Sequence, residues 1–595
     1  MNFNVKHRDG PARIGELSFK NKKIITPNLI FVNTKRFKAP QFADFLITNN
    51  DLKTTKPTLR FTESFIYANI NGLDLFSLKS DKEKKNNYSI INPNQELITD
   101  KLKNDPSIIF IIANASQLFQ QPKRFVDFIV SLREKIGYQK TIYLPAIGNP
   151  SNFAFLTYLG IDLFDSLYAI VAARNKMLLL SENQYHINNI EELPCSCPSC
   201  SSFKGKPSEM SFEIILNHNY HVMFNEIKNV RNAIICGFLR NLIETRIKTS
   251  AHLTTILRYL DMSHYNFLEK RTPVASKKMV LATTKESLFR SDIKRFQNRL
   301  IYRYKKPKAS KILLLLPCSA KKPYSFSKSH KLFRQQLFSS DNAFVFHELI
   351  LTSPLGLVPR ELELVHPASN YDIPVTGIWD EDEKKMIRSL LKEYLKKNSY
   401  DKIIMHLPIE ITEFLNDLIK EPVISCIDHP TSEKSLNNLL KILKEKAELY
   451  DKIRTQIRTK EDMECLASYQ FGKKIAKDLM KNCVVKGKYP YKKIMLNNIQ
   501  LGMITLERGF ISLTIQGAEK LLKSKEYWVE IHDDFKLKGS VFSPGVKNSD
   551  DQIRIGDEVI VIQKGKLQGV GVALMNGEEM KQSSHGEAVK IRHKI

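Results

Sequence analysis

The stretch "SIIFIIAN" (107–114) is an aliphatic run of the length expected for one buried strand. "QQPKRFVDFIVSLREKIG" (120–137) follows it with apolar residues at helical spacing, and "KTIYLPAIG" (140–148) returns to a strand-like run. Strand, helix and strand in this order are typical of a parallel sheet that is covered by helices. The chain up to about residue 190 is therefore predicted to be an α/β domain.

A second α/β unit is predicted from Lys311, where "KILLLLP" is followed by two further strand-like runs, "AFVFHELILTSP" and "DKIIMHLP". Between these two, "DEDEKKMIRSLLKEYLKKNS" (380–399) has acids in its first turn and lysines in its last, as the helix dipole favours. Beyond about residue 490, short strands alternate with glycine turns, which indicates a small β domain. A chain of 595 residues is too long for one hydrophobic core, so several domains are expected.

The chain is strongly basic, with 91 Lys and Arg against 63 Asp and Glu and a formal net charge of +28. Such an excess favours a polyanionic partner, although a lysine bias of the whole lineage would also produce it. The segment 270–311 holds fourteen Lys or Arg and two acids, with Phe289, Phe296, Tyr302 and Tyr304 among them. This pattern is typical of phosphate contact with base stacking, the alternative being an exposed basic helix that binds nothing.

The compartment follows from three features of the sequence. Eight cysteines are too few for a disulfide scaffold. No apolar stretch reaches the roughly 18 residues that span a bilayer, and the start, "MNFNVKHRDGPARIG", lacks the apolar region of a secretory signal. We therefore expect a soluble protein of the cytoplasm with no membrane segment.

The stretch "PCSAKKPYSFSKSH" (317–330) directly follows an aliphatic strand-like run, and the carboxyl ends of strands are where α/β sheets usually bind ligands. Cys318 is a candidate nucleophile, because Lys321, Lys322 and His330 lie close in sequence and positive charge lowers the pKa of a thiol. The alternative is a structural cysteine at the end of a strand. The nearby groups that can donate hydrogen bonds or transfer protons are Tyr324, Ser327 and His330.

A cluster of cysteines, "CSCPSC", places Cys195, Cys197 and Cys200 close together, and "LNHNYH" supplies His218 and His221 about eighteen residues later. Three thiols and a downstream histidine match a tetrahedral zinc site, with either histidine as the fourth ligand. Four protein ligands leave no open position for water, so we expect the zinc to be structural.

The run "YLGIDLFDSLYAIVAARNKMLLL" (158–180), followed by that cluster and by "HN", resembles the tRNA-guanine transglycosylase family. The resemblance implies a (β/α)8 barrel and selects His218 as the zinc ligand. It also places Asp165 where the family has the nucleophile that attacks the ribose anomeric carbon during base exchange.

Two parts of that family's pattern are missing from this sequence. The second essential aspartate lies in an Asp-Ser-Gly stretch that occurs nowhere in the chain, and the glycine-rich loop that reads the base is not found. General acid–base assistance commonly contributes about 10²–10⁴-fold to a rate, so base exchange should be weak without the second aspartate. The resemblance then implies a degenerate barrel that binds tRNA or the modified base, with Asp165 holding a turn or a helix cap.

The segments "GSVFSPGV" (539–546), "DQIRIGDEVIVI" (551–562), "GVGVALMNGEEM" (569–580) and "GEAVKIRHKI" (586–595) are similar in order and spacing to the PUA domain. That domain is an RNA-binding module of many tRNA-modifying enzymes. The resemblance implies a compact, partly open β-barrel, the alternative being an unrelated small barrel.

Residues 317–330 reproduce the Pro-Cys-x₃-Lys-Pro-Tyr-x₂-Ser-x₂-His motif of the archaeosine synthase family, a transglycosylase relative that ends in a PUA domain. "TSPLGLVPRELE" (352–363) and "YDIPVTGIWDEDE" (371–383) also resemble this family, and the resemblance covers essentially the whole chain. The residues to which it gives catalytic roles are Cys318, Lys322, Tyr324, Ser327 and His330.

That family makes archaeosine, a modified guanine in the D-arm of archaeal tRNA. The resemblance implies that an amine, free lysine through its ε-amino group, is added to the nitrile of 7-cyano-7-deazaguanine in tRNA to give an amidine. A partner radical-SAM lyase then converts the adduct to the formamidine. Cys318 is the candidate for a thioimidate intermediate, with His330 or Tyr324 handling protons and Lys322 tuning the thiolate, and direct amine addition is the alternative. Two other function classes remain: an active transglycosylase using Asp165, and a non-catalytic tRNA-binding accessory protein.

The predicted fold class is a multidomain α/β protein with a degenerate barrel, a zinc subdomain, a second α/β domain, a helical segment and a small β-barrel. The oligomeric state is left open. The expected domains are a transglycosylase-like barrel (1–190), a zinc-binding subdomain with the end of the barrel (191–275), a basic linker (276–310), an α/β catalytic domain (311–430), a helical connecting domain (431–489) and a PUA domain (490–595).

Overall fold

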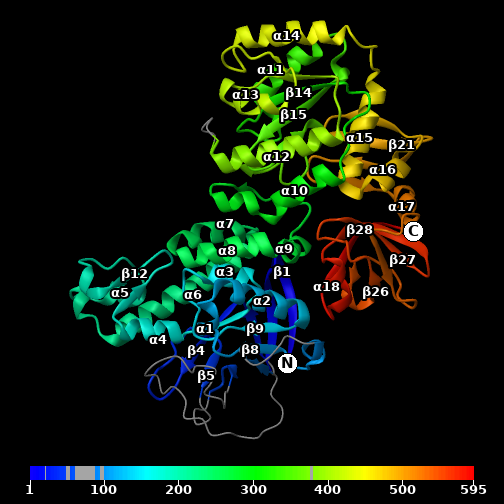
Figure 1. The fold of residues 1–595 in the computed structure, drawn as a ribbon. Helices are drawn as coiled ribbons and strands as arrows, with labels where there is room; N and C mark the ends of the chain where they lie inside the picture. Colours follow the sequence, from blue (N-terminus) through cyan, green and yellow to red (C-terminus); the bar gives the residue numbers. More distant parts are fainter. Residues whose placement is uncertain (20–21, 49–53, 60–87, 94–99, 375–378) are drawn as a thin grey trace. The chain divides into compact units, whose positions relative to one another are not determined.

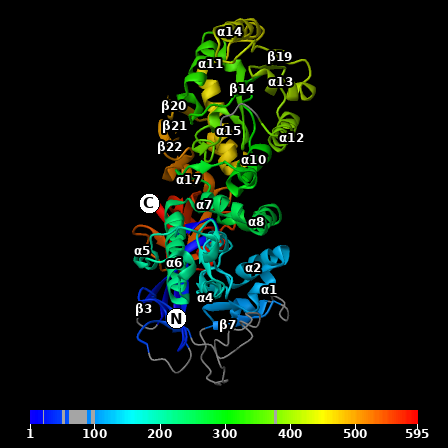
Figure 2. The ribbon, with the colours of Figure 1, turned by 90° about the vertical axis from the view of Figure 1, so that its left-hand side faces the viewer.

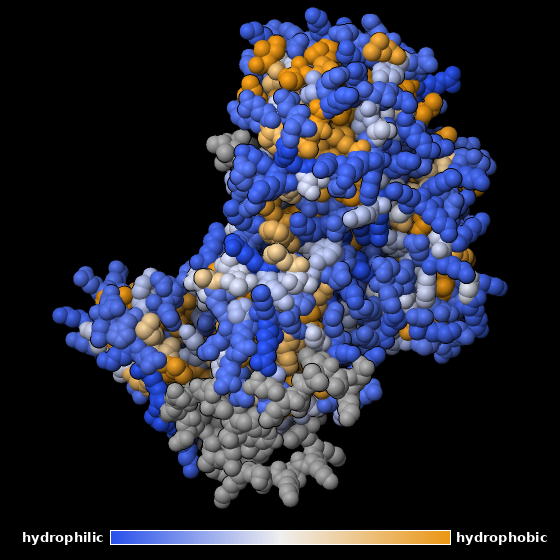
Figure 3. Space-filling model, viewed as in Figure 1, coloured by the Kyte–Doolittle hydropathy of each residue, from blue (hydrophilic) through white to orange (hydrophobic). Residues whose placement is uncertain are grey.

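The computed structural model divides the chain into two compact units (Figure 1). Unit 1 consists of Met1–Arg271 with Gln582–Gly586, and unit 2 of Thr272–Lys581 with Glu587–Ile595. Among the described residues, no helix combines the length and the apolarity needed to cross a bilayer. The face seen in Figure 3 is mostly hydrophilic, with apolar residues in separate patches. The structure describes every residue except 20–21, 49–53, 60–87, 94–99 and 375–378.

In the described part of unit 1, seven parallel strands form the barrel. Their order, β6-β5-β4-β10-β9-β8-β7, follows the chain around a ring, because the last strand, β10, pairs with the first, β4. Residues 60–87, between β6 and β7, lie outside the described part of the chain. The predicted α/β barrel is therefore confirmed, and its first predicted strand is β8, whose four residues are buried. The strands are β4 (Asn28–Asn33), β5 (Leu46–Thr48), β6 (Thr58–Leu59), β7 (Tyr88–Ile91), β8 (Ile109–Ile112), β9 (Thr141–Tyr143) and β10 (Leu163–Asp165).

Helices fill the connections of the barrel and continue beyond it. The predicted helix 120–137 is α2, which turns a face containing Phe125, Val126 and Ile129 toward the core. An antiparallel sheet precedes the barrel. A hairpin follows it, and the segment after the hairpin and the long helix α6 carry Cys195, Cys197, Cys200 and His218. The elements are β1 (Asn2–Asp9), β2 (Ala12–Phe19), β3 (Lys22–Thr26), α1 (Ala115–Phe119), α2 (Pro122–Ile136), α3 (Phe153–Tyr158), α4 (Leu167–Arg174), β11 (Met177–Leu179), β12 (Gln184–His186), α5 (Pro198–Ser202), α6 (Phe212–Cys236), α7 (Leu239–Arg246), α8 (Ala251–Ser263) and α9 (Tyr265–Arg271).

The second α/β sheet, in unit 2, has the order β16-β15-β14-β18-β19. β14, β15, β18 and β19 are parallel, and β16 runs antiparallel to β15. The chain leaves β14 for β15 through α11 and reaches β18, on the other side of β14, through α12. Right-handed crossovers in opposite directions place the two helices on opposite faces, as Figures 1 and 2 show. The elements are β14 (Ile312–Pro317), α11 (Lys328–Phe338), β15 (Phe346–Thr352), β16 (Gly356–Pro359), α12 (Glu381–Lys397), β18 (Lys402–Met405), α13 (Ile409–Leu415), β19 (Val423–Ile424) and α14 (Glu433–Ala447).

The segment 276–310 is not a linker, contrary to the prediction. It forms β13 (Val280–Leu281) and α10 (Ser291–Tyr302), and β13 pairs with β17 (Tyr371–Asp372) of the α/β region. The expected phosphate-contacting aromatics are divided: Phe296 and Tyr304 lie in the hydrophobic core, while Phe289 and Tyr302 are exposed. Arg295 and Arg299 are also buried, because the apolar face of α10 packs inward and draws their aliphatic stems with it.

The carboxyl-terminal part contains two sheets rather than one. A four-stranded antiparallel sheet precedes the six-stranded one that forms the nearly closed barrel, so short strands with glycine turns do not mark where the barrel begins. The elements are α15 (Thr455–Phe471), α16 (Lys473–Met480), β20 (Val484–Lys488), β21 (Tyr491–Leu496), β22 (Ile499–Ile504), β23 (Ile511–Leu513) and α17 (Ile515–Leu522), then β24 (Trp528–Ile531), β25 (Val541–Phe542), β26 (Val546–Ser549), β27 (Glu558–Gln563), β28 (Lys566–Ala573), α18 (Gly577–Gln582) and β29 (Glu587–Lys594).

Candidate functional site

Cys318 follows the last residue of β14, the central strand of the second α/β sheet. The two neighbours of β14 are reached by crossovers on opposite faces of the sheet, so the carboxyl end of β14 is a topological switch point. In open α/β sheets, ligands bind in the crevice at such a point. Cys318 is partly exposed there, whereas the five residues before Pro317 are buried.

Cys318 is surrounded by groups from three elements. The Lys322 Nζ lies 4.0 Å from the centre of the Tyr371 ring, and among the described residues this buried nitrogen has no hydrogen-bond partner. The Tyr371 hydroxyl is hydrogen-bonded to the Tyr324 hydroxyl and, at 2.5 Å, to Oγ1 of Thr352. The cluster thus contains a thiol, an amine and a chain of three hydroxyls.

Burial controls the charges of this cluster. It raises the pKa of the Cys318 thiol, outweighing the lowering effects of the Thr352 hydroxyl and of the Lys322 charge. It also lowers the pKa of Lys322, so both groups are shifted toward their neutral forms. The expectation that nearby positive charge lowers the pKa of Cys318 is therefore wrong for the free protein, because desolvation outweighs the charge of Lys322.

The other two motif residues, Ser327 and His330, lie at the start of α11, where the centre of the His330 ring is 5.1 Å from that of the Tyr324 ring. Ser327 is the N-cap, and its Oγ accepts a hydrogen bond of 3.2 Å from the backbone N–H of His330. The His330 ring is buried, and its Nδ1 accepts a hydrogen bond of 2.8 Å from Nη2 of Arg360. Burial and the Arg360 charge lower the pKa of His330 well below its ordinary value. The ring is therefore neutral near pH 7 and adds no positive charge to the site.

Arg360 joins the motif loop to the rest of the domain. Its guanidinium is paired with Glu348 at 2.6 Å and with Glu363 at 3.1 Å. Glu363 in turn accepts hydrogen bonds from the backbone N–H of Ser325, at 2.8 Å, and from the hydroxyl of Tyr489, at 2.7 Å. The loop between β14 and α11 is thus held by buried charged hydrogen bonds, which are stronger than neutral ones.

Three residues of this site were not singled out from the sequence: Thr352, Arg360 and Tyr371. Thr352 and Arg360 lie in the stretch 352–363 and Tyr371 begins the stretch 371–383, both of which resemble the family. The resemblance to the family identified these two stretches. A single sequence does not show which residues within them belong to the site. Residues 375–378 of the second stretch lie outside the described residues.

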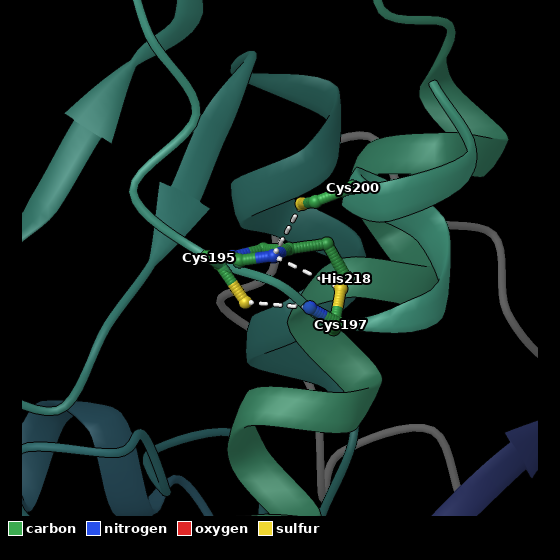
Figure 4. Close-up of side chains that lie close together, drawn as sticks. All are labelled: Cys195, Cys197, Cys200 and His218. Carbon is green, nitrogen blue, oxygen red and sulfur yellow. Dashed lines mark hydrogen bonds between the residues drawn. The ribbon is translucent and has the colours of Figure 1, made fainter. Parts of the chain in front are cut away.

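The cysteine cluster has the geometry of a metal site (Figure 4). Cys197 is the N-cap of α5 and Pro198 its first residue, so the helix turns Cys200 back toward Cys197. Nε2 of His218 donates a hydrogen bond of 2.9 Å to the Leu179 carbonyl, which leaves Nδ1 facing the sulfurs. His221 instead packs against an aromatic ring. The four residues whose ligand atoms lie within 4.8 Å of one another are Cys195, Cys197, Cys200 and His218.

These donors fit zinc. Three thiolates and an imidazole form a tetrahedral set that Zn²⁺ prefers, and the second ring nitrogen of such a histidine usually donates to a carbonyl or carboxylate. The hydrogen bond from His218 to Leu179 is of this kind. The cluster could therefore hold a zinc ion, with all four positions filled by protein.

Cys197→Ser is expected to remove about one equivalent of bound zinc, because a serine hydroxyl is not a ligand for zinc in such sites. Metal analysis of the purified protein measures the loss, and the thermal unfolding of unit 1 should shift to lower temperature. Cys236→Ser, which changes an exposed cysteine at the end of α6, is the matched control. Full zinc content and unchanged unfolding in the Cys197 variant would contradict the assignment.

Asp165 is the last residue of β10 and is fully buried. Its Oδ2 accepts hydrogen bonds from the Tyr143 hydroxyl, at 2.6 Å, and from the backbone N–H of Ala146, at 2.9 Å. Its Oδ1 accepts one from the N–H of Leu167, at 2.9 Å, in the first turn of α4. Burial raises the pKa of Asp165 to about 6, although these three hydrogen bonds act to lower it. The carboxylate thus links β9, the loop after it and the start of α4.

Three family models match the chain. One is described as queuine tRNA-ribosyltransferase and matches residues 90–252, which include Asp165 and the cysteine cluster. The second is a domain of unknown function, DUF5591, over residues 293–443, which include the Cys318 motif. The third is the PUA domain, over residues 534–595.

Relatives are similar over most of the chain. The archaeosine synthase subunit alpha of Methanosarcina acetivorans is 34% identical over 503 residues, which are 82% of this chain and 80% of that protein. The archaeosine synthase of Haloferax volcanii is 31% identical over 608 residues, 99% of either chain. The tRNA-guanine(15) transglycosylase of Methanobrevibacter smithii is 28% identical over 498 residues, 79% of this chain and 69% of that one.

Proposed function

Because this chain belongs to the archaeosine synthase family of tRNA-modifying enzymes, we propose that it adds free lysine to the nitrile of 7-cyano-7-deazaguanine in the tRNA D-arm. The lysine ε-amino group becomes part of an amidine. A radical-SAM lyase is the partner that acts on this product. The catalytic residues of the proposal are Cys318, Lys322 and Tyr324, with Ser327 and His330 as positioning residues.

The cluster around Cys318 is the observation that supports the proposal. A nitrile carbon is a weak electrophile, so its attack needs a strong nucleophile and a proton donor for the nitrogen. Cys318 and Lys322 offer a thiol and an amine whose neutral forms are favoured by burial. The hydroxyl chain of Tyr324, Tyr371 and Thr352 lies beside them.

The proposed steps conserve atoms and oxidation states. Lys322 accepts the Cys318 proton as sulfur forms a bond with the nitrile carbon, and the nitrile nitrogen takes up that proton to give a neutral thioimidate. The amine of the substrate lysine then attacks the same carbon. The carbon–sulfur bond breaks, the sulfur recovers a proton from the attacking nitrogen, and an amidine and free Cys318 remain.

The positioning residues act through the loop rather than on the substrate. Ser327 caps α11, and His330 accepts a hydrogen bond from Arg360. Both interactions fix the loop that carries Lys322 and Tyr324. The barrel and the PUA domain bind the tRNA, the cysteine cluster holds a structural zinc in unit 1, and Asp165 supports the barrel without attacking the ribose.

The direct test incubates the protein with tRNA that carries the cyano base and with isotope-labelled lysine. We expect the label in the RNA, and an added mass equal to one lysine on the modified nucleoside. Asp165→Asn should transfer label nearly as well as the wild type, because in the described part of the chain the hydrogen bonds of this carboxylate are to groups of the barrel. A folded Asp165→Asn protein without transfer would contradict the role given to Asp165.

The other function classes give different results in the same assay. Release or exchange of the base, lost in Asp165→Asn, would indicate an active transglycosylase. Binding of the tRNA without label or base release would indicate an accessory protein. Either result would overturn the proposal.

A further inference from the structure

The hairpin of β20 and β21 has an exposed basic face. Lys486 lies directly opposite Lys493 in the antiparallel pair, and Lys488 lies opposite Tyr491. Residues two apart on a strand, and residues opposite one another, share a face of the sheet. The hairpin face is therefore defined by Lys486, Lys488, Tyr491 and Lys493, which are all exposed.

The charges of the hairpin face are unfavourable for the hairpin itself. Like charges directly opposite each other destabilise an antiparallel pair, and Lys486 and Lys493 occupy such a position. Among the described residues, none of the three lysines of the face forms an ion pair. Glu507 accepts a hydrogen bond of 3.1 Å from the Tyr491 hydroxyl at the edge of the face. From residue 479 to residue 506 the sequence has five lysines and no acid.

The opposite side of the hairpin is firmly attached to the α/β domain. Ile494 is fully buried, and the Tyr489 hydroxyl, at the turn, donates to Glu363. Gly487, in β20, has a φ of +105°, and a Cβ there would lie 2.4 Å from the Tyr491 carbonyl oxygen, so this position of the strand requires glycine. The hairpin face thus lies on a support that is linked through Glu363 to Ser325 in the loop of the Cys318 motif.

We propose that the hairpin face is an RNA-binding surface that contacts the phosphate backbone of tRNA, outside the residues that match the PUA domain. A polyanion neutralises the opposed lysines, which explains why the hairpin keeps an arrangement that is unfavourable without a partner. The 46% exposed ring of Tyr491 offers a surface on which a base can stack. The hydrogen bond from Tyr489 to Glu363 places this contact beside the catalytic loop. The identity of the RNA rests on the proposed function.

The test separates a binding role from a structural one by reversing one charge. Lys493→Glu replaces the Lys–Lys pair by a Lys–Glu pair, so the melting temperature should stay the same or rise. The Kd for an unmodified tRNA transcript should nevertheless increase roughly tenfold or more, and the slope of log Kd against log salt should fall by about one or two. With the cyano-base tRNA, KM should rise and kcat should stay unchanged, as expected for a uniform binding interaction.

Lys434→Glu is the matched control, since it changes the net charge equally at an exposed position on α14. It should leave the Kd near that of the wild type. Lys486→Glu creates the same opposite-charge pair in reverse and must behave like Lys493→Glu. If both hairpin variants kept the Kd and the salt slope of the wild type, the proposal would be overturned. This would hold even if the hairpin face were then found to bind an acidic protein. A lower melting temperature in both variants would show that Lys486 and Lys493 do not destabilise the hairpin by repulsion. That result would overturn the proposal.

The binding assay does not depend on the chemistry. It uses unmodified tRNA and no lysine, so it can succeed when the labelled-lysine assay fails. It can equally fail when that assay succeeds. Failure of the proposed lysine transfer can therefore be distinguished from failure of the proposed tRNA binding by the hairpin face.

Discussion

Cys318→Ala is expected to reduce the transfer of labelled lysine to cyano-base tRNA by roughly 10³-fold or more. Losses of this size are typical when an enzyme loses a nucleophile that works together with a general base, here Lys322. The affinity for tRNA and the melting temperature should stay close to those of the wild type, because the change removes one partly exposed sulfur at the end of β14. Single-turnover kinetics with saturating tRNA measure the effect separately from binding.

Two further variants sharpen this result. Cys318→Ser should be nearly as inactive, because a hydroxyl ionises far less readily than a thiol near neutral pH. Cys426→Ala is the matched control, since Cys426 is also partly exposed and is the second residue after β19 of the same sheet. Wild-type protein incubated with cyano-base tRNA in the absence of amine should give a covalent protein–RNA adduct at Cys318. Substantial activity of Cys318→Ala would rule out the thioimidate and leave direct amine addition, with Lys322 as the base.

Arg360→Met is expected to destabilise unit 2 by about 3–5 kcal/mol, the range for removing one partner of a buried ion pair. The variant leaves Glu348 and Glu363 buried without the guanidinium that pairs with both. It also frees the His330 ring, so any folded fraction should have lost most of its lysine transfer. Urea unfolding followed by circular dichroism measures the change in the free energy of unfolding.

The pH dependence of this loss has a definite sign. Arg360 and Arg334 hold the pKa of Glu348 at about 2, below its ordinary value of 4.5, despite burial. The stability from this pairing is complete above pH 4.5 and is lost as the pH falls toward 2. Arg360→Met should therefore cost most near pH 7 and progressively less as the pH falls, because burial without the Arg360 guanidinium raises the pKa of Glu348 in the variant and the carboxyl becomes protonated.

Arg334→Met is the control for Arg360→Met. It removes a second partner of Glu348, at 3.2 Å, but the Arg334 side chain is 31% exposed. Its loss should therefore cost only about 1 kcal/mol or less. Equal losses for the two arginines, or a loss for Arg360→Met that does not change between pH 4 and pH 7, would contradict the role given to the Arg360 pairs.

Much of the architecture could be predicted because it depends on local pattern. The run at 107–114 and the helix that follows it appear as β8 and α2, since apolar spacing is a property of neighbouring residues. The candidate metal site was likewise found from spacing, because Cys195, Cys197 and Cys200 are near neighbours in the chain. The two α/β domains and the carboxyl-terminal β domain were each indicated in this way, whereas the resemblance to known families implied that the first and the last of these domains are barrels.

The features that could not be predicted are those that depend on burial and on the pairing of strands far apart in the sequence. The sequence by itself determined that Cys318 and Lys322 lie at the end of a strand, because that depends on a run of adjacent residues. Only the tertiary structure brought in Thr352, Tyr371 and Arg360, since parallel pairing of β14 with β15, and of β13 with β17, joins distant segments. Only the tertiary structure also decided that the pKa of Cys318 is raised and that Arg295 and Arg299 are buried. A sequence shows which charges are near one another along the chain, but desolvation depends on how many atoms from elsewhere in the fold exclude water from them.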